Sequence, residues 1–321
     1  MKISPGCTYC LLSRIHYQCN LSTTDINLIN EVMKKCIEKL GEEYSPEKTS
    51  TYVGTVVHRK CFEVLNDSDP YKHVKENNNK TALEVLPDIQ KLIYGISENE
   101  EALTFESSSK TDAEIFEKAV LAAVIGNYFD FGIFGQNASD DGFKQKFISF
   151  FNDGLKINDT KEMMERLSNV VYITDNCGEI VFDREVLQII QKIQQKSFKD
   201  KKENRETKLI LVVRGAPILT DATMKDVKEL EIENIVDSVL TTGSNAIGVC
   251  MKELPNETLE AMKAASLIIS KGMANYESLS DEKFGPIAFL LRTKCEAVAE
   301  SLGTEKGLSI AKIVKNDERP N

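Results

Sequence analysis

Two carboxylates and one amide occur in segments of the sequence where a metal-assisted reaction could take place. Asp175 and Asn176 follow a short run of β-branched residues, and Asp221 lies shortly after a second such run. All three side chains offer only oxygen ligands, which suits a hard divalent ion such as Mg²⁺ or Mn²⁺ and does not suit a structural zinc ion. Two carboxylates and one amide would leave coordination positions open for water and for substrate.

Glycine and cationic residues accompany these side chains. Glycines let a backbone approach a ligand closely, and cationic side chains hold phosphate oxygens. The sequence offers both types near the carboxylates, namely Gly178, Gly215, Gly243, Gly272, Arg214, Lys271 and Lys294. Taken alone, Asp221 also suits a helix N-cap and Asp175 also suits a turn. Polar residues recur after four of the predicted strands, however, and this recurrence favours a phosphate-ester site.

The elements that position these residues are predicted in the second half of the chain. Short β-branched runs predict strands, and amphipathic stretches between them predict helices. The strands are 169–174, 208–213, 235–240, 266–270 and 309–314, and the helices include 185–193, 226–230 and 286–302. Strands that alternate with helices predict a parallel sheet. Such a sheet binds ligands at the carboxyl ends of its strands, where these polar residues lie.

The first part of the chain is predicted to be helical. Apolar residues recur at spacings of three and four over 22–41, which indicates a helix that Thr23 or Thr24 could cap. Residues 114–134 are apolar on several sides and predict a buried helix. Two polar segments predict loops, 98–112 and 136–142.

The length of the chain suits one large domain or two ordinary ones. At 321 residues it can bury a sizeable core. From the change of pattern near residue 160 we expect an α/β protein. A mainly helical domain would occupy residues 1–160. A three-layer α/β/α Rossmann-like domain with a mainly parallel sheet would occupy 161–321 and carry the metal site.

Composition narrows the classes of partner. The chain has 50 acidic and 40 basic residues and a formal net charge of −10, which disfavours nucleic acid and anionic membranes as partners. No apolar run approaches the roughly 18 residues of a membrane span, and the start of the chain lacks the apolar core of a signal peptide. We therefore expect a cytoplasmic protein whose 8 cysteines are mostly thiols. The oligomeric state stays open.

At this point the residues resemble a known family. The chain is similar to the DUF89 family, also called damage-control phosphatases or the ARMT1-like family, over nearly its whole length. The motifs that carry the resemblance are Asp175-Asn176-x-Gly178-Glu179, Arg214-Gly215-x-Pro217 with Asp221, Thr223 and Asp226, Lys271-Gly272-x-x-Asn275-Tyr276-Glu277, Cys7-x-x-Cys10, Asp69-Pro70-Tyr71 and Gly126-Asn127-x-x-Asp130-Phe131-Gly132. The first cysteine pair and Arg292-Thr293-Lys294-Cys295 look like the archaeal and bacterial-type branch.

The resemblance implies a metal-dependent phosphatase that acts on small phosphorylated metabolites such as sugar phosphates, with Mn²⁺, Co²⁺, Ni²⁺ or Mg²⁺. It implies that Asp175, Asn176 and Asp221 are the metal ligands and the catalytic centre. It further implies a set of substrate-binding residues, namely Glu179, Asn275, Tyr276, Lys294 and Asn127. Larger eukaryotic members have Arg-Thr-x-Lys, whereas here the lysine comes one residue earlier, so Lys294 departs from that pattern.

The chemistry and the function class each leave alternatives open. Hydrolysis could use an in-line water, polarised by the metal or by Asp221, or direct attack by Asp175 to form an aspartyl-phosphate. An S-adenosylmethionine-dependent carboxyl methyltransferase is a second function class, although the residues after the first strand lack its glycine-rich loop. A non-catalytic metabolite-binding protein is a third class. A dehydrogenase is disfavoured because no Gly-x-Gly-x-x-Gly follows a strand.

A zinc site near the start of the chain also stays open. Cys7 and Cys10 have zinc-knuckle spacing, and His58 and Cys61 could complete a set of four ligands. The competing interpretation is a thiol pair that packs at the start of the first helix. The spacing of two cysteines alone does not decide between these two interpretations.

Overall fold

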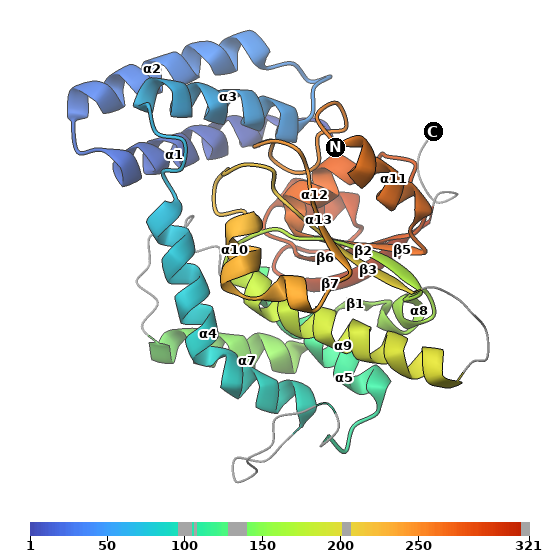
Figure 1. Ribbon diagram of the computed structural model, residues 1–321. Helices are drawn as coiled ribbons and strands as arrows, with labels where there is room; N and C mark the ends of the chain where they lie inside the picture. The colour runs from blue at the N-terminus through green and yellow to red at the C-terminus, as the bar shows by residue number, and fades with distance from the viewer. Residues whose placement is uncertain (96–104, 106–107, 128–139, 201–206, 316–321) are drawn as a thin grey trace.

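A single sheet forms the centre of the computed structural model, which describes residues 1–95, 105, 108–127, 140–200 and 207–315 (Figure 1). Its strands are β1 (Ile157–Asn158), β2 (Asn169–Ile173), β3 (Lys208–Val213), β4 (Ser238–Thr241), β5 (Leu267–Lys271), β6 (Ile287–Arg292) and β7 (Ser309–Val314). They lie in the order β1-β7-β6-β5-β2-β3-β4. Each neighbouring pair is parallel except β6 and β7. The predicted, mainly parallel α/β sheet is confirmed.

Helices cover both faces of this sheet. In chain order they are α1 (Pro5–Ser22), α2 (Ile26–Glu43), α3 (Ser50–Leu65), α4 (Lys72–Tyr94), α5 (Asp112–Gly126), α7 (Asp140–Asp153), α8 (Thr160–Met164), α9 (Glu179–Asp200), α10 (Met224–Glu229), α11 (Asn256–Ala264), α12 (Gly272–Leu279) and α13 (Glu296–Ser301). A 3₁₀ turn, Ile232–Asn234, precedes β4. None of the helices within the described residues has the length and apolarity to cross a membrane.

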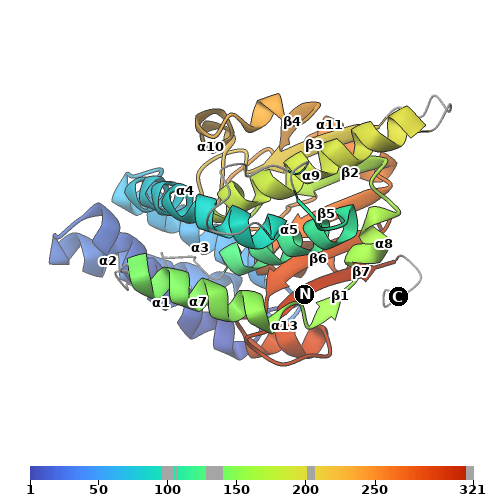
Figure 2. The ribbon, with the colours of Figure 1, turned by 90° about the horizontal axis from the view of Figure 1, so that it is seen from below.

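The alternation of side chains along each strand builds two separate cores. On β2, Val170 and Tyr172 face a core that contains α4, α5 and α9, whereas Val171 and Ile173 face a core that contains α11, α12 and α13. Strand side chains alternate between the two faces of a sheet, so a run that is apolar throughout requires helices on both sides. Figure 2 shows α5 and α9 side by side over one face.

The first three helices form a third core of their own. Ile15, Val32, Cys36 and Val57 are fully buried between α1, α2 and α3, and Figure 1 shows this bundle (blue) at one end of the molecule. Helices α4 and α5 also precede residue 160 and pack on the sheet layer against α9. The division of the chain into domains at residue 160 stays a prediction.

Two local predictions were wrong. The segment 286–302 was predicted to be one helix, but it contains strand β6, a turn and α13. Residues Ile287–Leu291 are buried on both faces, and a short, fully buried apolar run has no periodicity that separates strand from helix. The predicted cap of the second helix was also misplaced, because the Asp25 carboxylate accepts from the Asn27 amide and Thr23 ends α1.

Some sequence predictions fall where the structure gives no description. Much of the predicted loops 98–112 and 136–142 lies outside the described residues, as does Asp130. Where they are described, the loop prediction was wrong at Asp112, which begins α5, and at residues 140–142, which begin α7. The predicted buried helix is observed as α5 up to Gly126. Its apolar residues are buried on several sides of the helix, as predicted. Its predicted extension beyond Asn127 is not described.

Because β6 lies inside the sheet, replacing Phe289 measures how much the packing of this strand contributes to the stability of the fold. The ring is fully buried and meets Tyr276 edge-on, with ring centroids 4.9 Å apart. We expect Phe289→Ala to lower the free energy of unfolding by about 3–5 kcal/mol, through lost burial and the cavity left behind. Urea unfolding measures the loss, and Phe289→Leu, which retains most of the volume, should lose less. A loss below about 1 kcal/mol in the alanine variant would contradict this packing.

Candidate active site

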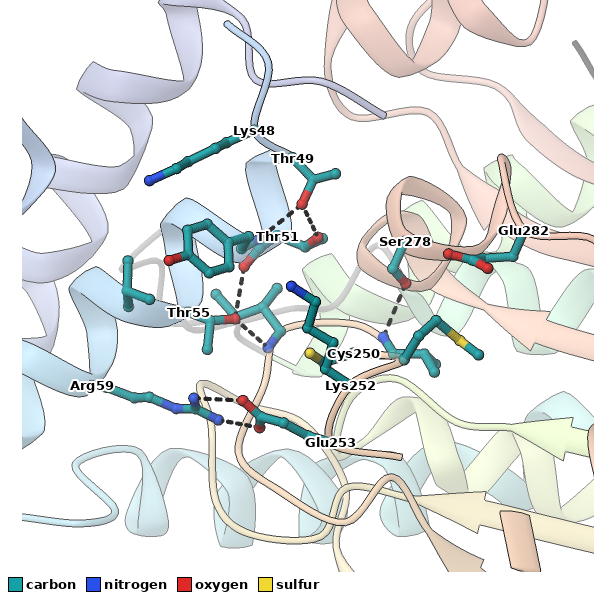
Figure 3. A pocket seen from close by; sticks show the side chains of 15 residues that line it. Lys48, Thr49, Thr51, Thr55, Arg59, Cys250, Lys252, Glu253, Ser278 and Glu282 are labelled. Carbon is teal, nitrogen blue, oxygen red and sulfur yellow. Dashed lines mark hydrogen bonds and ion pairs between the residues drawn. The ribbon is translucent and has the colours of Figure 1, made fainter. Parts of the chain in front are cut away.

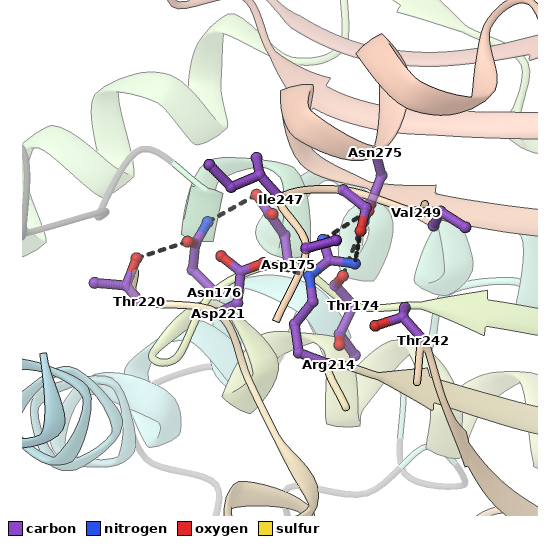
Figure 4. Close-up of polar contacts among 12 residues, drawn as sticks. Thr174, Asp175, Asn176, Arg214, Thr220, Asp221, Thr242, Ile247, Val249 and Asn275 are labelled. Atoms are coloured by element: carbon purple, nitrogen blue, oxygen red, sulfur yellow. Dashed lines mark hydrogen bonds and ion pairs between the residues drawn. The ribbon is translucent and has the colours of Figure 1, made fainter. Parts of the chain in front are cut away.

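The loops that follow β2 and β3 meet at the carboxyl edge of the sheet. Asp175 and Asn176 follow β2, and Asp221 lies in the loop after β3. A β-bridge joins Asn176 to Asp221, and the Ala222 amide donates to the Asp175 carbonyl over 2.8 Å. The backbone therefore holds the three predicted metal ligands together, as Figure 4 shows.

Asp175 lies at the centre of this cluster and is almost completely buried. Its Oδ2 accepts from Asn127 Nδ2 over 2.9 Å and from Asn176 Nδ2 over 2.8 Å. Burial raises the pKa of Asp175 well above its usual value, and the charges of Glu179 and Asp221 raise it further. The cationic side chains of Arg214 and Lys294 oppose this shift. The pKa directions indicate a carboxyl group crowded by like charge.

Gly272, the first residue of α12, allows Asp175 to occupy its position. Gly272 has a φ of +78°, which favours glycine, and a Cβ on it would lie 1.8 Å from Asp175 Oδ2. Any larger residue would therefore displace the carboxylate. The glycine of the predicted Lys-Gly motif is explained by this close approach.

Arg214 orients Asp221. Its Nε donates to Asp221 Oδ2, one terminal nitrogen donates to the Gly248 carbonyl over 2.8 Å, and the other donates to Asn275 Oδ1 over 2.7 Å. Asn275 in turn donates to the Thr174 carbonyl over 2.9 Å. The guanidinium is buried with all these donors bonded to protein, so its observed role is to position Asp221.

Lys271 forms a second buried ion-pair network beneath Asp175. Its Nζ donates to Glu179 Oε1, to Asp183 Oδ1 over 2.6 Å and to the Ala123 carbonyl over 3.1 Å. The sequence suggested that Lys271 could hold phosphate, but in the structure its donors bond to these protein groups. Asp183 was missed, although its position four residues after Glu179 on α9 places both on one face of a helix.

Glu179 connects this network to the cluster. Its Oε2 accepts from Asn127 Nδ2 over 2.8 Å and from Asn176 Nδ2 over 3.2 Å. It is also the first residue of α9, where the helix dipole favours a carboxylate. Asn127 ends α5, so this helix contributes the one described side chain from the first 160 residues that bonds directly to Asp175.

Of two predicted substrate-binding residues, Lys294 lies near the carboxylates and Tyr276 does not. Lys294 is half-buried, and its charge acts on Asp175, so it lies near the cluster. Tyr276 lies on α12 but packs into the second core, where its hydroxyl is 2.9 Å from Ser301 Oγ and its ring contacts Phe289. The side chain of Tyr276 is therefore not brought to the carboxylates, whereas that of Asn275 is buried and accepts from Arg214, which holds Asp221.

The four residues of the possible zinc site are not brought together. His58 Nδ1 is 2.8 Å from Gln18 Oε1, and burial together with the charge of Arg14 lowers its pKa to about 3. Cys61 lies against Cys19 and Cys36 in the bundle core, whereas Cys10 is exposed. No three His, Cys, Asp or Glu side chains in the described part of the chain converge in a way that would hold a metal ion.

The oxygen atoms around Asp175 nevertheless fit a hard divalent ion. The expected set contains only two carboxylates, Asp175 and Asp221, together with an amide. Asn127 Oδ1 is buried without a hydrogen-bond partner among the described residues, which leaves an acceptor open to a ligand. Asn176 directs its NH₂ group toward Asp175 and accepts from Thr220 with Oδ1 over 2.7 Å. A rotation of this amide by 180° would place Oδ1 where Nδ2 now lies, on the side of Asp175.

Comparisons with known proteins show to which family the chain is similar. A family model described as "Damage-control phosphatase ARMT1-like domain" matches residues 3–310. A protein of Archaeoglobus fulgidus named "Damage-control phosphatase" is 39% identical over 316 residues, covering 98% of this chain and 100% of that one. A Pyrococcus horikoshii protein, also named a damage-control phosphatase, is 29% identical over 310 residues and covers 96% of each. A crystal structure of a DUF89 family protein from Pyrococcus horikoshii has a TM-score of 0.80 at 27% identity, covering 98% and 99%.

Replacing Lys271 tests the buried network. Lys271→Met leaves Glu179 and Asp183 without their cation, so we expect a loss of about 3–5 kcal/mol in unfolding free energy at pH 7.5. Mainly through burial, the pKa of Asp183 is raised from 3.8 to about 6, and Lys271 opposes that shift. An acid with a raised pKa binds its proton more tightly in the folded state, so its ionisation destabilises the fold as pH rises through 6. The loss should therefore be smaller at pH 5.

Urea unfolding at the two pH values measures this difference. Lys225→Met is the matched control, because Lys225 is half-exposed and forms a surface ion pair with Glu76 at 2.8 Å. Such a pair contributes about 0–1 kcal/mol. If both variants lost equally little unfolding free energy at both pH values, the predicted contribution of the buried network to stability would be wrong.

Proposed function

The chain belongs to the damage-control phosphatase ARMT1-like (DUF89) family, and from this premise we propose that it is a metal-dependent phosphatase of small phosphorylated metabolites such as sugar phosphates. The observation that carries the proposal is the convergence of Asp175 and Asp221 at the carboxyl edge of the sheet. Parallel α/β sheets bind their ligands at this edge. The names of two relatives support the phosphatase activity.

Asp175, Asn176 and Asp221 would hold the divalent ion. When bound, such an ion would supply charge neutralisation and polarisation at the phosphate. Mg²⁺ and Mn²⁺ suit donors that are all oxygen atoms of carboxylates and an amide, and the family resemblance adds Co²⁺ and Ni²⁺ to the proposed ions. Arg214 keeps Asp221 in one orientation, and Gly272 leaves the space that Asp175 occupies.

Other residues of the chain would bind and orient the substrate. Lys294 is half-buried near Asp175, so its ammonium group could hold a phosphate oxygen. Asn127 and Glu179 fix the orientation of Asp175 and Asn176, and the open Oδ1 of Asn127 could accept from a substrate hydroxyl or a water. The attacking group could be a water or the Asp175 carboxylate itself, and both routes fit this arrangement.

No observation favours the alternative functions. A carboxyl methyltransferase needs a glycine-rich cofactor loop after the first strand, but here Asp175-Asn176-Cys177-Gly178 is bonded to the loop after β3 instead. A non-catalytic metabolite-binding protein would not need two buried carboxylates held against each other. The acidic composition also favours a small metabolite over a nucleic acid as the phosphate donor.

A phosphate-release screen tests the proposed activity. The protein is treated with EDTA, dialysed and assayed on a panel of sugar phosphates with each ion in turn. We expect no release after EDTA and recovery with Mn²⁺, Co²⁺, Ni²⁺ or Mg²⁺, because the ion supplies several kcal/mol of transition-state stabilisation. Full activity in the metal-free protein would reject the metal dependence. Absence of release with every ion and ester would reject the phosphatase.

Asp175 provides the residue-level test. We expect Asp175→Ala to lower kcat/KM by about a thousandfold or more, because it removes a metal ligand. The variant should remain folded with an unchanged or higher melting temperature, since it relieves repulsion between buried carboxylates. Asp281→Ala is the control, because Asp281 is an exposed carboxylate that pairs with the N-terminus. Near wild-type turnover in Asp175→Ala would exclude this residue from catalysis.

A further inference from the structure

The buried face of helix α4 changes from apolar to polar toward the start of the helix. Its later buried positions are apolar and recur every three or four residues, namely Ala82, Leu86, Ile89 and Ile93. At the same spacing, the earlier buried positions are Lys75, Asn78 and Asn79. A helix of a globular protein normally buries an apolar stripe. Three buried polar side chains near the start of α4 therefore need partners.

Two of these three side chains are bonded within the protein. The Lys75 ammonium group donates to Asp69 Oδ2 over 2.7 Å. Asn79 uses both ends of its amide, because Oδ1 accepts from the Gly178 amide over 2.6 Å and Nδ2 donates to Asp226 Oδ1 over 2.9 Å. Asn79 therefore ties the start of α4 to the loop that follows β2.

Asn78 differs from its neighbour in its hydrogen bonds. Both asparagines are buried, with 3% of Asn78 and 6% of Asn79 exposed. Asn78 Nδ2, however, has no hydrogen-bond partner among the described residues. A buried donor without a partner destabilises the folded protein, because it has lost its water and gained nothing in return. A ligand that supplies an acceptor removes this cost.

The Asn78 side chain lies beside the loop that carries the proposed metal ligands. A Cβ on Gly178 would lie 3.2 Å from Asn78 Cβ and 3.2 Å from the Asn78 carbonyl oxygen. Gly178 also has a φ of +82°, so glycine allows both this backbone conformation and the close approach of α4. Two peptide units, at most about 7.6 Å between Cα atoms, separate Gly178 from Asn176. A hexose phosphate is longer than this separation, so one molecule can extend from the metal ligands to α4.

Helix α5 reaches the same loop one residue further along. It packs against α4 (Figure 2), and a Cβ on Gly126 would lie 3.4 Å from the Cα of Glu179. Asn127, at its end, has an Oδ1 that no described residue bonds. The two helices thus bring an open donor and an open acceptor to consecutive residues of one loop. A hydroxyl group can accept from the first kind of group and donate to the second. These two amides therefore suit the hydroxyl groups of a sugar.

The pocket beside α3 does not offer such groups. It has a volume of about 530 Å³ and lies between α3 and the segment 247–253 (Figure 3). None of its described lining residues belongs to the carboxylate cluster. The hydroxyls in its lining already form hydrogen bonds within the protein, namely those of Thr51, Thr55 and Ser278. A substrate held at the cluster would not enter this pocket, so its organic part needs groups that border the cluster.

We propose that Asn78 is a substrate-binding residue, whose Nδ2 donates a hydrogen bond to a hydroxyl of the sugar when the phosphate lies at the Asp175 cluster. The inference rests on the proposed phosphatase function and adds to it a residue that selects sugar phosphates over esters without hydroxyl groups. A site in which a buried donor stays unpaired discriminates against a ligand that lacks the matching hydroxyl.

Two esters of different polarity test this role on the full-length protein with Mn²⁺. One is the sugar phosphate that the wild type hydrolyses best, and the other is phenyl phosphate, which has no hydroxyl group. Asn78→Leu removes the donor. It should lower kcat/KM for the sugar phosphate by about tenfold and leave that for phenyl phosphate within about twofold. Its melting temperature should be unchanged or higher, because the variant buries no unpaired donor.

Asn79→Leu is the matched control, because Asn79 is the adjacent buried asparagine and both ends of its amide are bonded. It should lower the melting temperature and affect the two esters to the same extent. If Asn78→Leu does not fold, Asn78→Asp retains the size, replaces the donor by an acceptor and should show the same loss of preference. The proposal is overturned if the Asn78 variants keep the wild-type ratio of kcat/KM between the two esters.

Binding of a sugar phosphonate, which cannot be hydrolysed, separates this inference from the proposed function. Calorimetry with Mn²⁺ compares its Kd with that of methylphosphonate. The sugar compound should bind more tightly to the wild type, and this advantage should fall by about tenfold in Asn78→Leu. That result supports the role of Asn78 even if no ester releases phosphate, an outcome that would reject the phosphatase alone. The same advantage in wild type and variant would reject the role of Asn78.

Discussion

The compensation of buried negative charge is the constraint on which the rest of this structure depends. Carboxylates at one edge of the sheet lie within a region from which water is largely excluded, so each needs a cation or a proton to remain buried. Arg214 neutralises Asp221, and Lys271 is shared between Glu179 and Asp183. The described residues that donate to Asp175 are amides, and burial, followed by the charges of Glu179 and Asp221, raises its pKa. A divalent ion at Asp175 would complete the compensation.

The two buried cations differ in what they fix. Lys271 links the end of β5 to the first turn of α9 and thereby sets the position of Glu179. Arg214 links the loop after β3 to Gly248 and Asn275, in segments that follow β4 and β5. The N–H donors of both cations bond to protein groups, so neither side chain is free to bind a phosphate. Rigid support of this kind is what a site with pre-oriented ligands requires.

The helical bundle affects the site through one helix. Thr55 and Arg59 of α3 bond to the segment 245–253, and Gly54 accommodates Ile247. This segment also supplies the Gly248 carbonyl to Arg214. The bundle therefore reaches the carboxylates without contributing a side chain to them. A change in α3 can therefore alter the environment of Arg214.

Local sequence determined the strands and most of the polar residues that follow them. Short β-branched runs bounded by polar or glycine residues specify β2, β3, β5 and β7. Once a parallel sheet is expected, Asp175 and Asp221 fall at its carboxyl edge for topological reasons. Pattern failed at β6, because this buried apolar run contains only one β-branched residue, Ile287, and has no periodicity that separates strand from helix.

Only the tertiary structure decided which polar residues meet and which cations are already neutralised. The pairing of Lys271 with Asp183, of Arg214 with Gly248, and of α3 with Ile247 joins residues 34 to 192 positions apart. The neighbouring residues Asn275 and Tyr276 point to different environments because successive side chains on a helix diverge by about 100°. The sequence by itself determined the oxygen-bearing side chains of Asp175, Asn176 and Asp221 and the edge of the sheet where they lie. Long-range packing determined the charge balance among these side chains, since contacts of this separation leave no local pattern.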